Sequence, residues 1–368
     1  MPSQSQSVTT ISVENVEDVL KYTGLIQANT NHKKQINYLT SKSVRPDYTQ
    51  GGLKMSEPYK IIDFHTHSFP EGIAYRAVHK LSHTGNLKNY TNGTIGDLTS
   101  SMKHGNISLS VLMPVVTKPE QQESINSIAI QVNSHTESTG LISFGGLHPE
   151  NYDYKDIIDR LWKLNFKGIK FHPVYQDTPI DDTLYLKIID YALSKDLYIT
   201  IHAGKDISMP ANGYASVKRL RTLVKEFNSD KIILAHMGGW DEWDEAEEYL
   251  VGSNVIFDTA FCLNPIRPSE YLDLSSDTNI SNASARCNSQ DMPKYQNLHP
   301  ENNNIRPLLS SEQFVRMVRN HGVDKIIFGS DSPWSEQVES VELIRNSGLT
   351  PEEQKQIMCD NPARILGL

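Results

Sequence analysis

The sequence predicts an α/β fold, a (β/α)8 TIM barrel, as a single domain with an N-terminal extension and a long insertion after the seventh strand. Short apolar runs rich in β-branched residues alternate with amphipathic stretches, which is typical of parallel strands buried on both faces. Eight strands that are each followed by helical sequence indicate a barrel. The runs are residues 60–64, 108–116, 141–146, 168–171, 197–201, 231–235, 255–261 and 325–328.

Amphipathic stretches between these runs predict the helices that would cover the barrel. The last helix is expected to begin at Thr350-Pro351-Glu352-Glu353, which is a capping box with proline in the first turn. The other clear examples are residues 120–133, 154–164, 184–195, 215–227 and 311–321.

A doubly wound open sheet is the alternative fold, and the end of the first strand argues against it. Such a sheet would carry a glycine-rich GxGxxG turn there to bind a dinucleotide. The first run is followed instead by His65-Thr66-His67-Ser68-Phe69-Pro70, and no P-loop is present in the sequence. The barrel is therefore preferred.

Two segments fall outside the repeating pattern. Residues 1–54, rich in Ser, Thr, Gln and Asn, are either a disordered extension or an arm that packs on a neighbouring chain. Within the predicted barrel of residues 55–368, residues 263–310 follow a strand's carboxyl end and must emerge on the catalytic face. They are interpreted as an active-site lid or an oligomer contact, with solvated padding as the alternative. Without both segments the length approaches the roughly 250 residues of a typical barrel.

Composition excludes several classes of protein. The 368 residues include 35 Lys+Arg and 44 Asp+Glu, a net charge of −9 that does not favour nucleic acid or an anionic membrane surface. No apolar run approaches the roughly 18 residues of a membrane span, and the first residues lack a signal-peptide layout. Three cysteines without CxxC spacing fit a reducing, cytoplasmic setting. A homodimer, the commonest assembly, is left open.

Histidines gather where the predicted strands end. Six of the 13 histidines lie at the carboxyl ends of strands, and Asp331 lies at the equivalent place on the eighth. Scattered core histidines would show no such preference, and barrel active sites are built at this face. The six are His65, His67, His148, His172, His202 and His236.

The spacing of these residues predicts a metal site. Residues two apart on a strand share a face, so Asp63, His65 and His67 are expected to face the barrel interior together. Imidazole and carboxylate ligands suit a divalent transition metal with one position open for water. With His202, His236 and Asp331 at neighbouring strand ends, the pattern favours a metal centre that acts on a small-molecule substrate.

These residues also carry a family resemblance. From about residue 59 to 368 the chain resembles the amidohydrolase superfamily, most of all its amidohydrolase-related group of metal-dependent barrel hydrolases and decarboxylases. The resemblance implies that His65, His67, His202 and Asp331 hold one divalent metal ion. Zinc is favoured, with manganese or iron as alternatives. The matching stretches are Ile62-Asp-Phe-His-Thr-His67, Gly168-Ile-Lys-Phe-His-Pro173, Ile201-His-Ala-Gly204, Leu234-Ala-His-Met-Gly-Gly239, Phe328-Gly-Ser-Asp-Ser-Pro333 and Asn361-Pro-Ala-Arg364.

The expected reaction is hydrolysis of an amide, ester or lactone of a small carboxylated molecule. A bound cation lowers the pKa of its water to about 7 and so supplies hydroxide. Asp331 would take the water's proton and His236 would polarise the carbonyl, which makes both catalytic residues. The alternative is non-oxidative decarboxylation of an aromatic or unsaturated acid, in which protonated Asp331 or His236 gives a proton to carbon. A barrel that only binds a ligand is the third hypothesis.

The remaining candidates have two interpretations each. Lys170 is expected to pair with Asp63 beneath the site, or to bridge two metal ions as a carboxylated lysine. His148 and His172 either contact the substrate or cap their strands, and Tyr175 and Trp334 would line the pocket. A decarboxylase would need a cation for the substrate carboxylate, and Arg76, Arg267 and Arg286 are the candidates.

Overall fold

The computed structural model describes residues 59–269 and 309–368. The predicted extension of residues 1–54 lies outside the described residues. So does the predicted insertion, apart from residues 263–269 and 309–310. The described residues belong to the unit Ser56–Leu368.

The described strands pair in parallel, in the order of the sequence. One sheet holds β1 to β3 and the other holds β4 to β9. The third predicted run is divided in two, because Phe144 interrupts it between β3 and β4. The strands are β1 (Ile61–Thr66), β2 (Ile107–Leu112), β3 (Leu141–Ser143), β4 (Gly145–Gly146), β5 (Gly168–Phe171), β6 (Tyr198–Ile201), β7 (Ile232–Leu234), β8 (Ile256–Asp258) and β9 (Ile326–Ile327).

Backbone hydrogen bonds link the first strand to the chain that follows the last one. The N–H of Phe64 donates to the carbonyl of Phe328 at 2.8 Å, and the N–H of His67 donates to Ser332 at 2.6 Å. Gly329 permits this approach, since a Cβ on it would lie 2.7 Å from the Cβ of His65. The first and last strands of the series are therefore neighbours, as the barrel topology requires.

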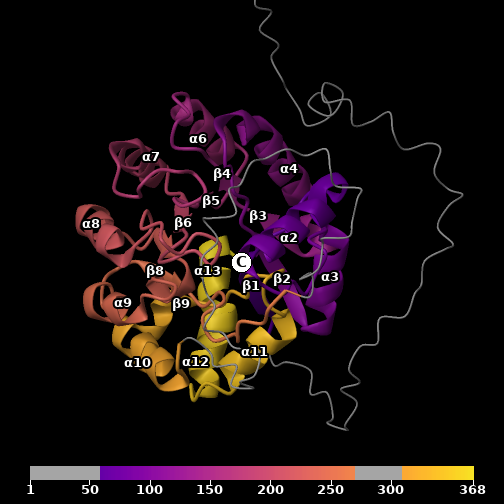
Figure 1. Cartoon of the computed structure of the whole chain (residues 1–368), viewed down its shortest axis with the longest axis vertical. Helices are drawn as coiled ribbons and strands as arrows, with labels where there is room; N and C mark the ends of the chain where they lie inside the picture. Colours follow the sequence, from indigo (N-terminus) through magenta and orange to yellow (C-terminus); the bar gives the residue numbers. More distant parts are fainter. Residues whose placement is uncertain (1–58, 270–308) are drawn as a thin grey trace, which may run out of the picture. The chain divides into compact units, whose positions relative to one another are not determined.

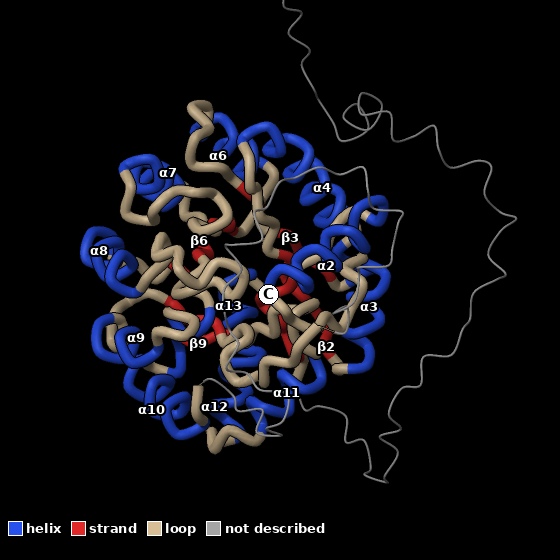
Figure 2. Tube along the Cα trace, in the orientation of Figure 1, coloured by secondary structure: helices blue, strands red, loops and turns tan. Residues whose placement is uncertain are grey.

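Helices surround the central strands, as Figure 1 and Figure 2 show. The predicted capping box at Thr350 is confirmed, with Glu353 completing it. No helix in residues 59–269 and 309–368 is long and apolar enough to cross a membrane. The helices are α2 (Glu71–Gly85), α3 (Ile95–His104), α4 (Gln122–Ser134), α5 (Thr136–Thr139), α6 (Tyr154–Lys163), α7 (Thr183–Ser194), α8 (Val217–Phe227), α9 (Trp243–Tyr249), α10 (Ser311–His321), α11 (Gln337–Arg345), α12 (Pro351–Lys355) and α13 (Asn361–Leu366).

Two groups of buried apolar side chains hold the fold together. The larger packs the helices onto the outer face of the strands and includes Leu161, Ile188 and Leu220. The smaller joins residues of β1, β2, β6, β7, β8 and β9, among them Phe64 and Ile233, which meet across the space that the strands enclose. Polar side chains at the carboxyl ends of the strands lie above this apolar floor.

Candidate active site

A cavity of about 510 Å³ opens at the carboxyl ends of the strands. It brings together nine of the eleven predicted site residues, which come from β1, β5, β6, β7 and β9 or the loops directly after them. Phe69, Met113, Trp240 and Phe261 add apolar surface. The nine predicted residues are His65, His67, Lys170, His172, Tyr175, His202, His236, Asp331 and Trp334.

His65, on β1, is oriented by a buried carboxylate. Its Nδ1 lies 2.7 Å from Oδ2 of Asp258, an acceptor, so Nδ1 carries the proton and Nε2 presents its lone pair. The Nζ of Lys170 approaches that lone pair at 3.2 Å. Burial, and then the charge of Lys170, lower the pKa of His65 to about 4, so its ring is neutral at physiological pH.

A nitrogen of His67 and a carboxylate oxygen of Asp331 face one another, and both are hydrogen-bond acceptors. The Nδ1 of His67 donates to the carbonyl of Met113 at 2.9 Å, which leaves Nε2 as an acceptor. That Nε2 lies 3.1 Å from Oδ1 of Asp331. Burial would raise the pKa of Asp331, but His67 and His65 hold it well below its usual range. Two acceptors at this distance require a proton or a metal ion between them.

His202 and His236 form a second facing pair. The Nδ1 of His236 donates to the carbonyl of Ala260 at 2.8 Å, so its Nε2 is an acceptor, 3.0 Å from Nδ1 of His202. The Nε2 of His202 lies 3.2 Å from the carbonyl of Lys205. Burial holds the pKa of His202 well below its usual value. A neutral ring has one N–H and cannot donate in both of its contacts.

The ligand atoms of this site fit a divalent cation. Ligand atoms of His65, His67 and Asp331 lie within 4.8 Å of one another. Two imidazoles whose other nitrogen is held by a carboxylate or a carbonyl, together with one carboxylate, match the ligand chemistry of zinc, manganese or iron. A metal ion would replace the missing proton between His67 and Asp331.

His202, the fourth predicted ligand, groups differently. Its ligand atom clusters with those of His172 and Asp206. In this second cluster Nδ1 of His172 accepts the backbone N–H of Tyr175 at 3.4 Å, so Nε2 carries the proton of a neutral ring and offers no lone pair. The first cluster therefore suits a metal better, and the ligand role of His202 stays a prediction.

The expected pairing of Lys170 with Asp63 is wrong. Lys170 contacts His65, whereas the Asp63 carboxylate accepts from the Ser330 hydroxyl at 2.6 Å and from Gln337 of α11 at 2.7 Å. Asp63 does not line the cavity, because the strand register shifts between Asp63 and Thr66 and breaks the alternation on which the expectation rested. Burial raises the pKa of Asp63 to about 6.

His148 is a strand-end histidine that the structure does not bring to the cavity. Its Nδ1 accepts the backbone N–H of Glu150 at 3.3 Å. The backbone of the loop after β4 thus holds its ring. This arrangement suits the capping interpretation of His148 rather than substrate contact.

Two acidic residues of the site escaped the sequence reasoning. Asp258 ends β8 and accepts from His65 and from the backbone N–H of His236. Burial would raise the pKa of Asp258, but its contact with His65 lowers the value overall. A lone carboxylate inside the apolar run of residues 255–261 was the available signal. Asp206 follows β6 in a loop that showed no periodicity.

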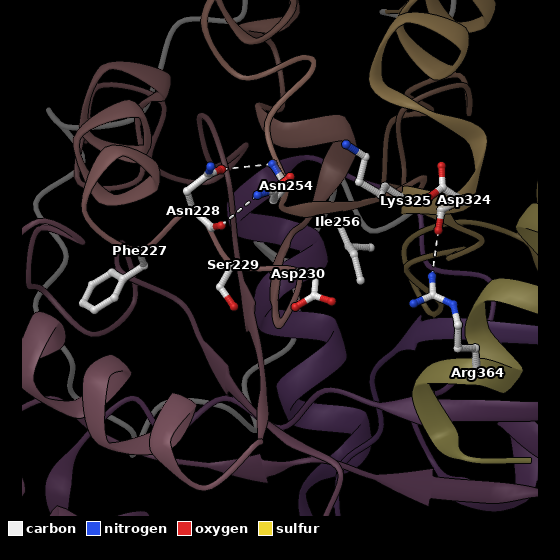
Figure 3. A pocket seen from close by; sticks show the side chains of 9 residues that line it. All are labelled: Phe227, Asn228, Ser229, Asp230, Asn254, Ile256, Asp324, Lys325 and Arg364. Atoms are coloured by element: carbon white, nitrogen blue, oxygen red, sulfur yellow. Dashed lines mark hydrogen bonds between the residues drawn. The ribbon is translucent and has the colours of Figure 1, made fainter.

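Another cavity, of about 580 Å³, lies at the opposite end of the strands (Figure 3). Its lining includes Asp230, Ile256 and Lys325, which precede or begin β7, β8 and β9. Asn228 and Asn254 are hydrogen-bonded there, and Arg364 bonds to the carbonyl of Asp324. Although this cavity is slightly larger, it lacks a histidine cluster and lies on the face of a barrel that serves stability.

Comparison with solved structures supports the fold. A 2,6-dihydroxybenzoate decarboxylase from Rhizobium is 13% identical, with a TM-score of 0.54 over 84% of this chain and 99% of that chain. A 5-carboxyvanillate decarboxylase from Novosphingobium aromaticivorans, complexed with manganese, is 13% identical with a TM-score of 0.57, over 84% and 97%. A probable 2-pyrone-4,6-dicarboxylic acid hydrolase from Acinetobacter baumannii is 13% identical with a TM-score of 0.50, over 84% and 100%.

Comparison at the level of sequence gives the family. No curated protein sequence matches the chain. The amidohydrolase family profile, however, matches residues 62–368, which include every residue that lines the cavity with the histidine cluster. Members of this family bind a divalent metal ion, in keeping with the ligand chemistry of His65, His67 and Asp331. The chain therefore belongs to the amidohydrolase family of enzymes.

Proposed function

We propose that this enzyme removes carbon dioxide, without oxidation, from a small aromatic carboxylic acid. The observation that carries the proposal is the burial of Lys170 beside the metal-type cluster, by which we mean His65, His67 and Asp331. Its Nζ contacts His65, and no carboxylate of the described residues forms an ion pair with it. A buried ammonium that no carboxylate contacts directly is costly, and a substrate carboxylate would supply that contact.

The charge of Lys170 persists at neutral pH. Burial lowers its pKa to about 8, while Asp258 and Asp331 oppose that shift. No arginine among the described residues lines the cavity, and Arg267, one of the candidates, is held by Glu339 at 2.6 Å. Lys205 also lines the cavity, but its Nζ lies 2.9 Å from Oδ2 of Asp241, so Lys170 is the cation best placed to receive the carboxylate.

The protein groups around the cavity can carry out the proton transfer. The bond between the ring carbon and the carboxylate carbon breaks, its electron pair stays on the ring carbon, and carbon dioxide leaves. His236 takes up a proton from solvent at Nε2 and gives it to that carbon, while its Nδ1–H stays on the carbonyl of Ala260. Asp331, with its lowered pKa, is a poor proton donor and acts as an anionic ligand.

His65, His67 and Asp331 would hold one divalent metal ion, for which zinc is our first choice and manganese or iron the alternatives. Bound there, the ion would coordinate oxygen atoms of the substrate and polarise their bonds. The solved decarboxylases of this fold, one of them with manganese, support the same reaction class.

Hydrolysis of an amide, ester or lactone is the second candidate, and Asp331 favours it. An ionised, buried carboxylate beside the cluster could accept a proton from an attacking water. The same cavity and ligands serve both reactions, so the ligands do not distinguish them.

One assay separates the two reactions. Protein loaded with zinc or manganese is incubated with aromatic acids and, separately, with lactones and amides. We expect carbon dioxide release and, in deuterated water, deuterium at the carbon that lost the carboxylate. Acid release from lactones or amides, without carbon dioxide from any acid, would favour hydrolysis.

Lys170→Met tests the residue that carries the proposal. The kcat/KM for the acid is expected to fall by a factor of about 100, mainly through a higher KM, since the charge-assisted contact that binds the substrate carboxylate is lost. Lys163→Met, on the exposed side of α6, is the matched control and should leave turnover unchanged. Full activity of Lys170→Met would contradict the proposed role.

A further inference from the structure

The wall of the cavity formed by His172 and Asp206 is not needed for the metal cluster. His172 directly follows β5, and Asp206 lies in the loop after β6. Each side chain is 8% exposed, and both line the cavity. Their facing atoms, Nε2 of His172 and Oδ2 of Asp206, lie 3.6 Å apart, beyond ordinary hydrogen-bond distance.

Neighbouring contacts fix which of these atoms donates and which accepts. Nδ1 of His172 accepts the N–H of Tyr175, so the proton of the neutral ring is on Nε2, as described above. Oδ1 of Asp206 accepts from the N–H of Ser208 at 2.9 Å, from its hydroxyl at 2.5 Å and from the Tyr175 hydroxyl at 3.4 Å. Oδ2 of Asp206 keeps capacity to accept.

This wall comes from different strands than the cluster of His65, His67 and Asp331, which lies at the ends of β1 and β9. Neighbouring rings run from His65 to His236 (5.4 Å between centroids), then to His202 (4.8 Å) and His172 (4.1 Å). Tyr175 stacks on the far side of the same series, 4.1 Å from His172. A ligand anchored at His65 therefore shares one cavity with His172 and Asp206.

We infer that His172 and Asp206 form a subsite for a hydroxyl group of the substrate, distinct from the atoms held by His65, His67 and Asp331. A hydroxyl oxygen can accept from Nε2 of His172 while its proton is donated to Oδ2 of Asp206. This inference rests on the proposed function and narrows the substrate class to hydroxylated aromatic acids. Asp206 and His172 here select the substrate by binding its hydroxyl group, and they transfer no proton in the reaction.

Ligand binding tests the subsite without requiring turnover. Benzoate, 3-hydroxybenzoate and 4-hydroxybenzoate are titrated into the manganese-loaded protein by calorimetry. At least one hydroxylated acid is expected to bind about 10-fold to 100-fold more tightly than benzoate, because its hydroxyl bonds to a buried charged group. In Asp206→Asn that affinity ratio should fall toward one, while benzoate binds as before.

Two further variants separate recognition from general damage. His172→Gln keeps an N–H donor near the position of Nε2 and should retain most of the ratio, whereas His172→Leu should lose it. Tyr175→Phe removes a hydroxyl from the same cluster and leaves Oδ2 of Asp206 in place, so its ratio should equal that of the wild type. A structural defect would weaken benzoate and the hydroxylated acids alike.

The outcomes distinguish this inference from the proposed function. If benzoate binds and neither hydroxyl adds affinity, the subsite is wrong while the carboxylate site stands. The subsite is also wrong if Asp206→Asn keeps the wild-type ratio. If none of the three acids binds, the proposed function fails and the subsite fails with it.

Discussion

Individual histidines of this enzyme differ in what their second nitrogen contacts. In His65, His67 and His236 one nitrogen donates to a carboxylate or a carbonyl, so the other presents a lone pair to the cavity. In His148, by contrast, Nδ1 accepts a backbone N–H and the ring does not line the cavity. The hydrogen-bond partners of a histidine thus distinguish rings that could bind a metal from rings that hold the backbone, although both kinds lie at strand ends.

Asp258 is the carboxylate that should tune metal affinity without touching the metal. Asp258→Asn replaces the strong acceptor for the Nδ1–H of His65 and weakens the orientation of that ring. We expect affinity for zinc or manganese to fall by about 10-fold to 100-fold. Competition with a chelator measures this.

A matched change at the opposite end of the strands controls for the loss of charge. Asp230→Asn, in the cavity of Figure 3, should leave metal affinity unchanged. Equal affinities of Asp258→Asn and the wild type would show that Asp258 does not orient His65.

Residue types and their spacing could predict much of the metal-type cluster. Contacts that depend on the register between paired strands could not be predicted. His65, His67 and Asp331 stood out because polar residues end otherwise apolar strands. The partner of Lys170 depends on how β1 and β5 are staggered across the barrel, and β1 is irregular between Asp63 and Thr66. No spacing along the chain reveals that irregularity.

At the scale of elements, the end of α10 is fixed to β8 by a buried histidine. The Nε2 of His321 donates to the carbonyl of Val255 at 2.8 Å, and its Nδ1 accepts the N–H of Gly252 at 3.1 Å. Its ring stacks on Phe257 with centroids 4.0 Å apart. The neutral ring meets both backbone groups, so protonation at Nδ1 would break one of these bonds.

His321 should make stability depend on pH. Burial lowers its pKa to about 4 from an ordinary value near 6.5. Between these values the unfolded chain binds the proton that the folded protein excludes. The stabilising contribution is therefore complete above pH 6.5 and is lost as pH falls toward 4, by about 3 kcal/mol in all.

Denaturant unfolding at several pH values tests this contribution. The free energy of unfolding should decrease less steeply with falling pH in His321→Gln than in the wild type. Other histidines titrate equally in both proteins and cancel in the difference. Parallel curves across pH 4 to 6.5 would contradict the expected titration of His321.

The order of elements was more predictable than their ends. Helix α10 begins and ends as predicted, because Ser310 caps it and Gly322 follows it. The second and seventh predicted strands are shorter in the structure, since apolar sequence continues into loops after Leu112 and Asp258. Hydrophobic runs show which residues are buried but not where strand pairing stops.

At the scale of the whole molecule, the cluster of His65, His67 and Asp331 joins the two ends of the strand series. His65 and His67 belong to β1 and the residue after it, whereas Asp331 follows β9. A cation held between them would connect the first and last strands in addition to the backbone hydrogen bond from Phe64 to Phe328. Metal binding is thus expected to stabilise the fold as well as to serve the reaction.

Metal addition to chelator-treated protein measures this coupling. A ligand that binds the folded state alone stabilises it by about 2.7 kcal/mol at a concentration of one hundred times Kd. We therefore expect the melting temperature to rise with zinc or manganese concentration, and His67→Ala to abolish the rise. His148→Ala should melt at a lower temperature, because a buried side chain and its backbone hydrogen bond are lost, yet keep the full metal-dependent rise. A metal-dependent rise that survives in His67→Ala would place the ion elsewhere in the protein.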